Sequence, residues 1–353
     1  MNKLKKICIL SVMITFSFTL LNGQYTHRKN QQSEKEYIDS IKNTPYPWKL
    51  PIMGSKIRKK GFDLPNPNGL MANYIFGVQD ITMENLAIGT QDDPSTFTDV
   101  SNIVGFDHIT ARVQVINFKY DFYLLPFLNF YALGGYVISN TDVALALPFV
   151  ADFTAHGEGP MFGWGTVFSG GVGPFIFSTD YNMAWTYLPQ LDGPSLAQVF
   201  DFRLGHMFKF KNRPQMNLVA LIGTSYQKLA KFSVGSWNVS EMVGFSQEEK
   251  EDALNNLNDW YDELPQHSQD QLEGIYDGFS GWLENGEDTY LRYSFDKRLY
   301  YPWSMTLGIN YQLNHRYQFT FVYTVLGSRS QYLFGFNYRF GFRGKNYLAG
   351  LTL

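Results

Sequence analysis

Apolar and polar residues alternate through the C-terminal third of the chain. From Trp303 to Leu313, from Tyr317 to Val325 and from Tyr332 to Phe342, every second residue is apolar, and most of these are aromatic. The residues between them are mainly Ser, Thr, Gly, Asn and Gln. A soluble β-sandwich also alternates, but its apolar face is mixed aliphatic and its outer face carries charge. Membrane-spanning strands of about ten residues fit better, so we predict an all-β fold, a transmembrane antiparallel β-barrel.

Earlier segments repeat this alternation, at residues 162–168, 175–187 and 200–210. Residues 107–123 alternate in two registers. Val113 and Val115 share one face, whereas the apolar residues from Ile116 onward share the other. We interpret this switch as a β-bulge near Val115.

Turn lengths predict the orientation and the number of strands. Barrels of this type have short periplasmic turns and longer extracellular loops. The short connections at 212–214 and 314–315 are therefore predicted to be periplasmic, and the longer segments 146–159 and 234–301 extracellular. This parity gives ten strands, or twelve if additional arms pair, within a barrel that covers residues 68–353.

Residues 1–23 have the pattern of a secretory signal peptide. Three lysines precede an apolar run of about 15 residues, Ile7 to Leu21, which is shorter than a spanning helix. Cys8, the only cysteine, lies at the start of this run, so we expect neither a lipid anchor nor a disulfide in the mature chain. Residues 24–67 are polar and contain clustered prolines. They predict a periplasmic extension with extended backbone around the prolines, or alternatively a small internal plug.

The period changes from two to about 3.6 within residues 246–288. Ser246 and Glu249 form a capping box, an apolar stripe follows, and Pro265 separates two helical stretches. The segment has 13 acidic residues and one basic residue, a net charge of −12. We predict a helical hairpin inserted in one extracellular loop. It is either a solvated acidic cap whose stripe rests on the barrel rim, or a lid that gates entry.

Composition narrows the classes of function. The formal net charge of −3 gives no basis for nucleic-acid binding, and charged residues reach only 17 %. No run of 18 apolar residues follows the signal, which argues against a helical inner-membrane protein. Metal-ligand clusters, phosphate-binding glycine loops and nucleotide motifs do not occur in the sequence, so we expect no metal and no cofactor.

Charged and amide side chains on the polar side of the predicted strands are expected to line the barrel interior. These candidate lumen-lining residues are Arg112, Lys119, Asp121, Asp180, Asn182, Asp201, Arg203, Lys209, Asn337 and Arg339. Charges in a narrow interior must pair or stay hydrated. They form either a salt-bridge network that fills the lumen or a polar pore whose charges set ion preference. Ten strands lie near the border between these two cases.

An enzyme that acts on lipids is the least favoured class. His206 is predicted to face the membrane among Phe residues, where such an enzyme would place a base. However, no Ser lies two residues from it on the same face, and no grouping of His, Asp and Ser has an interpretable spacing. We therefore expect no catalytic residue and place His206 near a membrane interface.

Three motifs in the chain are familiar from membrane barrels: LPFLN at 125–129 followed by Tyr131, DYNMAWT at 180–186, and GSRSQ at 327–331 leading to YRF at 338–340. They resemble a little-characterised group of Gram-negative outer-membrane β-barrels, and the aromatic richness resembles the Bacteroidetes type. The resemblance spans roughly residues 65–342. It implies an outer-membrane barrel, usually described as porin-like, and no catalytic residue. One departure is that the chain ends at Leu353, eleven residues beyond Phe342, whereas such barrels often end in an aromatic residue that the insertion machinery recognises.

The sequence thus favours a small porin-like channel or transporter in the outer membrane, for a small solute that it does not identify. The alternative is a non-conducting barrel that anchors or presents its extracellular loops to a partner. Outer-membrane lipid and the barrel-assembly machinery are the expected partners in both cases.

Overall fold

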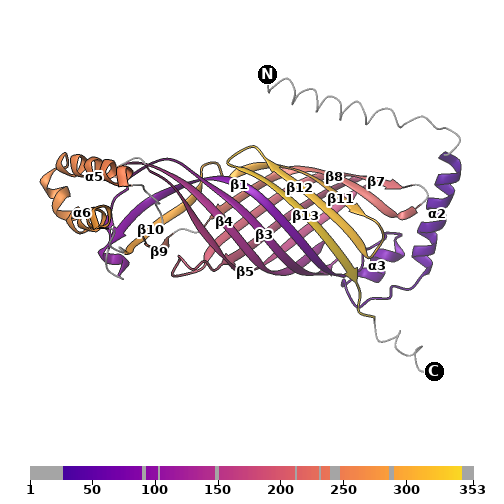
Figure 1. The fold of residues 1–353 in the computed structure, drawn as a ribbon. Helices are drawn as coiled ribbons and strands as arrows, with labels where there is room; N and C mark the ends of the chain where they lie inside the picture. Colours follow the sequence, from indigo (N-terminus) through magenta and orange to yellow (C-terminus); the bar gives the residue numbers. More distant parts are fainter. Residues whose placement is uncertain are drawn as a thin grey trace, which may run out of the picture.

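Ten antiparallel strands form a closed barrel (Figure 1), because the last strand pairs with the first. The computed structural model describes residues 27–89, 93–101, 104–147, 151–210, 213–229, 232–238, 247–285 and 290–343. In barrel order the strands are β1 (Asn68–Gly89), β3 (Gly105–Leu125), β4 (Leu128–Leu147), β5 (Ala151–Val172), β6 (Phe175–Thr186), β7 (Ser195–Phe210), β8 (Arg213–Leu229), β11 (Trp303–Gln312), β12 (Tyr317–Val325) and β13 (Arg329–Phe340). The predicted antiparallel barrel is confirmed.

The remaining elements lie at the two ends of the barrel (Figure 1). Helices α2 (His27–Asn43) and α3 (Gly54–Lys59) lie at the end where short turns join the strands, which we call the short-turn end. The opposite end carries η1 (Pro94–Thr96), β2 (Thr98–Asp99), β9 (Ser233–Asn238), α5 (Gln247–Asp262), α6 (Gln266–Asn285) and β10 (Tyr290–Leu299). Helices α5 and α6 are the predicted hairpin. No helix in the described residues is long and apolar enough to cross a membrane.

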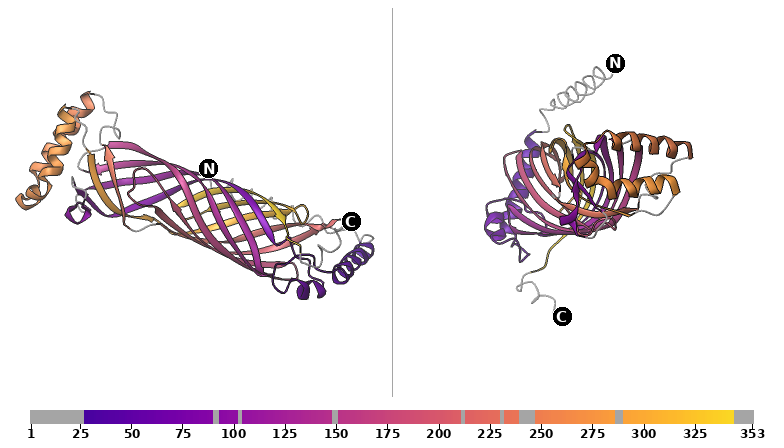
Figure 2. Two further views of the ribbon diagram at one scale, coloured as in Figure 1. Left: turned by 90° about the horizontal axis from the view of Figure 1, so that it is seen from below. Right: turned by 90° about the vertical axis from the view of Figure 1, so that its left-hand side faces the viewer.

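The barrel wall is much taller on one side than on the other (Figure 2). Strands β1, β3, β4 and β5 have 22, 21, 20 and 22 residues, whereas β11, β12 and β13 have 10, 9 and 12. About ten residues of a tilted strand cross a bilayer. The four tall strands, which we call the long wall, therefore project beyond the bilayer by roughly 20 Å.

The apolar side of the long wall changes from the outer to the inner face along each strand. In β3, Ile116 and Phe118 are 56 % and 67 % exposed on the outer face. Nearer the start of the strand, Ile109 and Ala111 are 4 % and 0 % exposed on the inner face. Strand β3 pairs with β1 without a register shift near Val115. The predicted bulge is therefore wrong: the strand is regular around Val115, and its apolar residues change face because the surroundings change from lipid to water.

This change of face divides the barrel into a membrane half, next to the short-turn end, and a projecting half. Strands β4 and β5 stay paired into the projecting half, as far as Leu145 opposite Ala151. Val143 is 2 % exposed on their inner face. Most of segment 146–159, predicted as a loop, is therefore the beginning of β5.

A two-stranded ribbon crosses the end of the long wall. Strand β10 pairs with the part of β1 from Ile81 to Gly89, and β9 pairs with β10. The free edge of β9 meets the connection between β6 and β7, where Leu191 forms a bridge with Gly235. In the same connection Asp192 forms an ion pair with Arg292 of β10. The ribbon therefore joins the long wall to the opposite side of the barrel.

The helical hairpin packs on the projecting half through its apolar stripe. Leu257 and Leu283 are 1 % and 3 % exposed in a cluster that includes Ile88 of β1. Leu272 is 2 % exposed in a second cluster, with Phe295 of β10. The hairpin, the ribbon and the long wall thus share one apolar core.

Residues 27–66, which we call the N-terminal segment, fold onto the short-turn end. Ile41, near the end of α2, is 3 % exposed. Backbone hydrogen bonds join the segment to the barrel, from Lys49 N–H to Phe342 O (3.1 Å) and from Ile52 N–H to Leu124 O (2.9 Å). The sequence predicts an extended lead-in here, but the structure has two helices. Helix α2 contains too few apolar residues for a stripe to be recognised in the sequence.

Candidate functional site

The outer face of the membrane half is a belt of exposed apolar side chains. Phe162, Phe175, Ile222 and Phe334 are 59 %, 66 %, 51 % and 53 % exposed. A continuous belt of this kind is stable against hydrocarbon and would be an aggregation site in water. This half of the molecule is therefore built to span a lipid bilayer.

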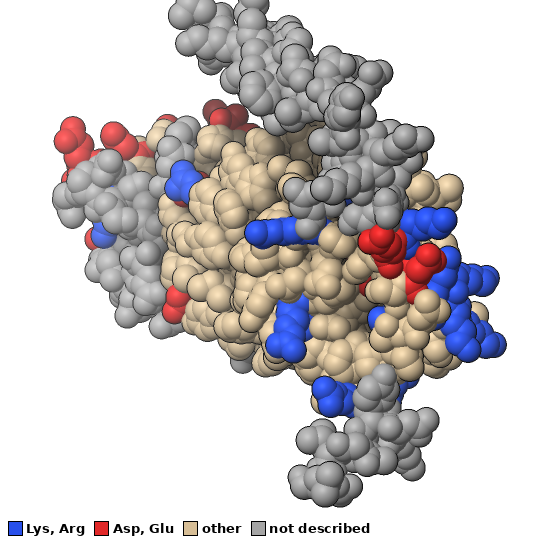
Figure 3. Space-filling view, turned by 90° about the vertical axis from the view of Figure 1, so that its right-hand side faces the viewer, with Lys and Arg blue, Asp and Glu red and all other residues tan. Residues whose placement is uncertain are grey.

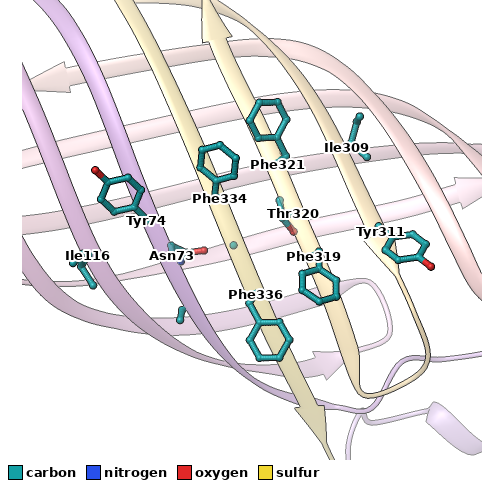
Figure 4. Close-up of a pocket in the computed structure, with 12 residues that line it drawn as sticks. Asn73, Tyr74, Ile116, Ile309, Tyr311, Phe319, Thr320, Phe321, Phe334 and Phe336 are labelled. Carbon is teal, nitrogen blue, oxygen red and sulfur yellow. The ribbon is translucent and has the colours of Figure 1, made fainter.

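A groove of about 550 Å³ lies in the belt (Figure 4). Outward-pointing rings, among them those of Phe319, Phe321 and Phe334, stand on either side of it, and Gly335 is among the residues that line it. The lining is almost entirely apolar. The groove therefore belongs to the lipid-facing surface, where acyl chains fill such spaces.

Inside the barrel, one cluster of polar residues lies near the short-turn end. Arg339 of β13 forms an ion pair with Asp121 of β3 at 3.0 Å, and Asn129 of β4 donates a hydrogen bond to the same carboxylate at 2.7 Å. Asp121 and Arg339 are 2 % and 5 % exposed. Gly69 of β1 makes room for them, because a Cβ there would lie 2.3 Å from Asp121 Oδ2. The buried charge is thus both paired and hydrogen-bonded, as a dry site requires.

A second cluster occupies the adjoining strands β3, β4, β6 and β7. Tyr131 Oη donates a hydrogen bond to Asp180 at 2.7 Å, and Lys119 Nζ lies 4.1 Å from the centre of the Tyr131 ring. Arg203 forms an ion pair with Asp201 at 2.6 Å. Asp180 and Asp201 are opposite each other in the pairing of β6 with β7. Two carboxylates and two cations therefore share one layer of the interior.

A third cluster, around Arg329, is missing from the sequence prediction. Arg329 is 5 % exposed and donates hydrogen bonds to Ser225 Oγ at 2.6 Å and to Gln227 Oε1. Gln227 in turn lies 3.5 Å from Gln79 of β1. The signal was present, because residue 329 shares the period-two face of Arg339. The regular alternation of aromatic residues begins only at Tyr332, three residues after Arg329, so it does not reach this position.

Of the remaining predicted lumen-lining residues, two lie on the inner face, one is exposed near the short-turn end, and one lies on the outer face. Asn337 is 5 % exposed on the inner face, and Asn182 is partly buried there. Lys209 has the inward register of β7 but lies exposed near the short-turn end. Arg112 differs from the prediction: it is on the outer face, its side chain is 59 % exposed, and it pairs with Asp142 at 2.9 Å. The bulge that would have turned Arg112 inward does not exist.

Side chains fill the interior at the level of these clusters. Asn117, Ser225, Thr306 and Thr324 all point inward and are 5 %, 2 %, 2 % and 5 % exposed. A water-filled channel would leave inward side chains accessible to water. The described interior of the membrane half is therefore packed at these positions.

An apolar layer lies beyond the polar clusters, at the start of the projecting half. It consists of five side chains in one contact cluster that are between 0 % and 7 % exposed, namely Ile81, Ile109, Ala111, Val143 and Leu299. They come from β1, β3, β4 and β10. Leu229 of β8 packs against this cluster, so apolar side chains of the long wall, the ribbon and β8 meet at this level of the barrel.

Lys297 is an exception in this apolar surrounding. It lies on β10 opposite Met83 and shares the inward register of Phe295 and Leu299. Burial lowers the pKa of its ammonium group below the usual 10.5. Within the described residues no ion pair to Lys297 is present. The protonated form of Lys297 therefore lowers the stability of the folded projecting half.

A second hollow, of about 540 Å³, lies at the rim of the projecting half. It is formed by the connection between β6 and β7, by the adjacent ends of these strands and by the start of β9, with the lining residues Trp185, Asp192, Gly193, Pro194, Ser195, Leu196, Phe232, Ser233 and Val234. Phe232 is 66 % exposed with a positive φ of 57°, held by a hydrogen bond from its N–H to Asp296 at 2.6 Å. Phe232 is thus an exposed aromatic side chain at the edge of this hollow, on a backbone conformation that is uncommon for its residue type.

His206 lies on the outer face between two phenylalanine rings. Its ring centre is 5.5 Å from that of Phe175 and 4.5 Å from that of Phe208. Within the described residues no group accepts or donates a hydrogen bond at its Nδ1. Nothing there orients the imidazole as a base. The described residues also contain no group of three or more His, Cys, Asp or Glu placed to hold a metal ion.

No protein-family model and no curated protein matches the chain. Solved barrels are similar at low identity. The β domain of the Bordetella autotransporter BrkA is 9 % identical, with a TM-score of 0.33, over 78 % of this chain and 100 % of that one. The translocator domain of NalP from Neisseria meningitidis is 8 % identical (TM-score 0.32, 90 % and 97 % covered), and the toluene transporter TodX of Pseudomonas putida is 10 % identical (TM-score 0.28, 77 % and 88 % covered). Likenesses this distant give no guidance on function.

Proposed function

We propose that this protein is a non-conducting β-barrel of the outer membrane that displays a folded extracellular structure on its long wall. The observation that carries the proposal is the apolar layer around Ile109 and Ala111, which lies above a polar interior filled by side chains. A packed aliphatic layer offers no polar path to a hydrated ion or solute.

The contacts within the projecting half support a helical hairpin that is fixed in place on the barrel. A hinged lid would need a separable contact with the rim. Here the leucines of the hairpin are buried in clusters with β1 and β10, and the Asp192–Arg292 ion pair joins the ribbon to the far wall. The acidic cap that rests on the rim is therefore the better description of residues 247–285, the described part of the predicted hairpin.

The displayed surface is hydrophilic and acidic. Residues 247–285 contain eleven Asp and Glu and one Lys. Within the described part of the hairpin no large apolar side chain is among the exposed ones. Such a surface favours long-range attraction of cationic partners over hydrophobic association. We propose no solute and no catalysed reaction, and we expect outer-membrane lipid and the barrel-assembly machinery as partners.

A narrow channel is the second candidate. Its support comes from buried polar atoms without a hydrogen-bond partner in the described residues, Asn73 Oδ1, Thr306 Oγ1 and Asn337 Oδ1. Each is a position where an ordered water can bind, and a chain of such waters would be a polar path.

Planar-bilayer recording separates the two candidates. Protein shown to be folded by its heat-modifiable gel mobility is expected to give no conductance steps. A variant that lacks residues 247–285 is expected to stay silent, because the apolar layer lies in the barrel. Discrete steps from the full chain would favour the channel, and steps that arise only after the deletion would make the hairpin a gate.

Labelling of cells tests the display itself. A peptide epitope inserted between Pro265 and Gln266, in the turn of the hairpin, is expected to bind antibody on intact cells. A matched epitope in the short turn at Asn314 is expected to bind only after permeabilisation. The reverse pattern would contradict the proposed orientation.

A further inference from the structure

The N-terminal segment contains a purely basic stretch. Residues 44–62 include five Lys and Arg and no Asp or Glu. Lys49, Lys56, Lys59 and Lys60 are exposed. Figure 3 looks onto the short-turn end and shows Lys and Arg gathered toward one side of it. This end of the molecule is thus opposite in charge to the acidic hairpin.

Asp63, the acidic residue that directly follows this stretch in the chain, is paired with other groups. Asp63 accepts hydrogen bonds from His315 at 2.8 Å and from Tyr37 at 2.7 Å. Burial raises the pKa of Asp63, but the hydrogen bond and charge of His315, the hydrogen bond of Tyr37 and the charge of Arg58 outweigh burial and lower it. The carboxylate is thus engaged in attaching the segment to the β11–β12 turn.

The same stretch presents apolar side chains to the exterior. Ile52, Met53 and Phe62 are 53 %, 48 % and 58 % exposed. Met53 has a positive φ of 70°, which is uncommon for this residue type, and it immediately precedes α3. The backbone is therefore held in a strained turn that keeps two adjacent apolar side chains exposed.

This stretch lies at the edge of the lipid-facing belt. Lys49 and Ile52 are bonded through their backbones to Phe342 and Leu124 at the rim of the barrel. Phe342 is itself 57 % exposed. Viewed along the barrel, α2 and α3 lie to one side of its outline (Figure 2). Residues 49–52 therefore lie next to the edge of the apolar belt, at the level of a membrane surface.

We infer that residues 49–62 bind the membrane surface at the short-turn end, with their exposed apolar side chains in the headgroup–acyl boundary and their lysines on anionic phospholipid headgroups. Apolar side chains next to lysines are the composition of interfacial membrane contacts. Each lysine near an anionic surface adds attraction that salt screens. A soluble acidic protein would satisfy the lysines but would leave the continuity with the lipid-facing belt unexplained.

Hydrogen exchange of α3 tests the headgroup contact. The full chain is reconstituted in nanodiscs of phosphatidylcholine alone or with about 30 % phosphatidylglycerol. Amide exchange in residues 54–60 is expected to be about tenfold slower in the anionic discs, and the difference is expected to disappear in about 0.5 M salt. Equal exchange in both kinds of disc would overturn the inference.

Matched charge variants assign the effect to this site. Lys59→Gln/Lys60→Gln is expected to abolish the lipid-dependent protection. Lys35→Gln/Lys42→Gln removes the same charge from exposed positions on α2 and is expected to preserve it. Equal loss in both pairs would mean a general attraction of the basic end and would contradict a contact at residues 49–62.

Spin labels test the apolar contact without using charge. Since Cys8 is the only cysteine, Ile52→Cys in a Cys8→Ser background carries a single label. In the nanodisc this label is expected to be reached by oxygen and shielded from a water-soluble nickel chelate. Asn43→Cys, at an exposed position of α2, is the matched control and is expected to be reached by the chelate. Equal access of the chelate to both labels would show that Ile52 faces water and would refute the membrane contact.

Discussion

The membrane half and the projecting half of the long wall use the same strands with opposite faces. In the membrane half of β3, Phe118 is 67 % exposed on the outside and Asn117 is 5 % exposed on the inside. In the projecting half of the same strand, Arg112 is on the outside and Ile109 is on the inside. The backbone pairing is continuous between them. Only the surroundings change, so the comparison teaches that the solvent outside the barrel decides which face of a strand is apolar.

The largest effect is expected from breaking the ion pair inside the membrane half. Arg339→Leu leaves Asp121 buried without a cation, so the free energy of unfolding is expected to fall by about 3–5 kcal/mol. Guanidinium titration of the protein in detergent, followed by tryptophan fluorescence, measures the change. The double variant Asp121→Leu/Arg339→Leu is expected to regain most of the loss. A double variant as unstable as the single one would mean that the arginine contributes through packing.

A matched pair on the outer face of β3 tests where the membrane ends. Phe118→Arg places a charge in the lipid-facing belt and is expected to cost about 3 kcal/mol. Thr110→Arg, eight residues away on the same face, lies in the projecting half and is expected to change stability by less than about 0.5 kcal/mol. Unfolding titrations in lipid vesicles report both values. Similar costs would place Thr110 in lipid and remove the division into halves.

Truncation of isoleucine on the two faces compares protein packing with lipid packing. Ile109→Ala leaves a cavity in the apolar layer and is expected to cost about 2 kcal/mol. Ile116→Ala opens a space that acyl chains fill, and is expected to cost about half as much. Hydrogen exchange of β3 is the measurement, because it reports the two halves separately. A larger cost at Ile116 would contradict a protein core around Ile109.

Lys297 is a charged residue in the otherwise apolar interior of the projecting half, so it tests how strongly that interior disfavours a charge. Because burial lowers its pKa, the folded state binds fewer protons than the unfolded state, and stability is expected to rise with pH up to about 10.5. Lys297→Met is expected to stabilise the projecting half by about 1 kcal/mol and to remove that pH dependence. Exchange rates of β10 between pH 7 and pH 10 provide the test. An unchanged slope in the variant would assign the dependence to another group.

The membrane half could be predicted from sequence because lipid imposes a strict rule on it. Outward positions such as Phe334 and Phe336 must be apolar, so a period of two is visible residue by residue. The interior residues Asp121, Asp201 and Arg339 follow from the same alternation. The helical hairpin was visible for an equivalent reason, since Leu257 and Leu272 keep a helical period.

The projecting half could not be predicted in the same way. A period of two identifies a strand but does not say which face is covered. The change of apolar face at Val115 predicts a bulge and an inward Arg112, because the sequence does not show that the surroundings of the strand change there. The contact between α5–α6 and β1 joins segments far apart in the sequence, so no local pattern encodes it.

Strand β1 has two partners placed end to end on one of its edges. Leu299 of β10 is opposite Ile81, and Arg329 of β13 is opposite Gln79. Once β10 is in place, the final closure joins chain positions about 30 residues apart rather than about 250, which lowers its entropic cost by about 2 kcal/mol. The ribbon at the far end is thus also a clamp for assembly: it holds the first strand within reach of the last.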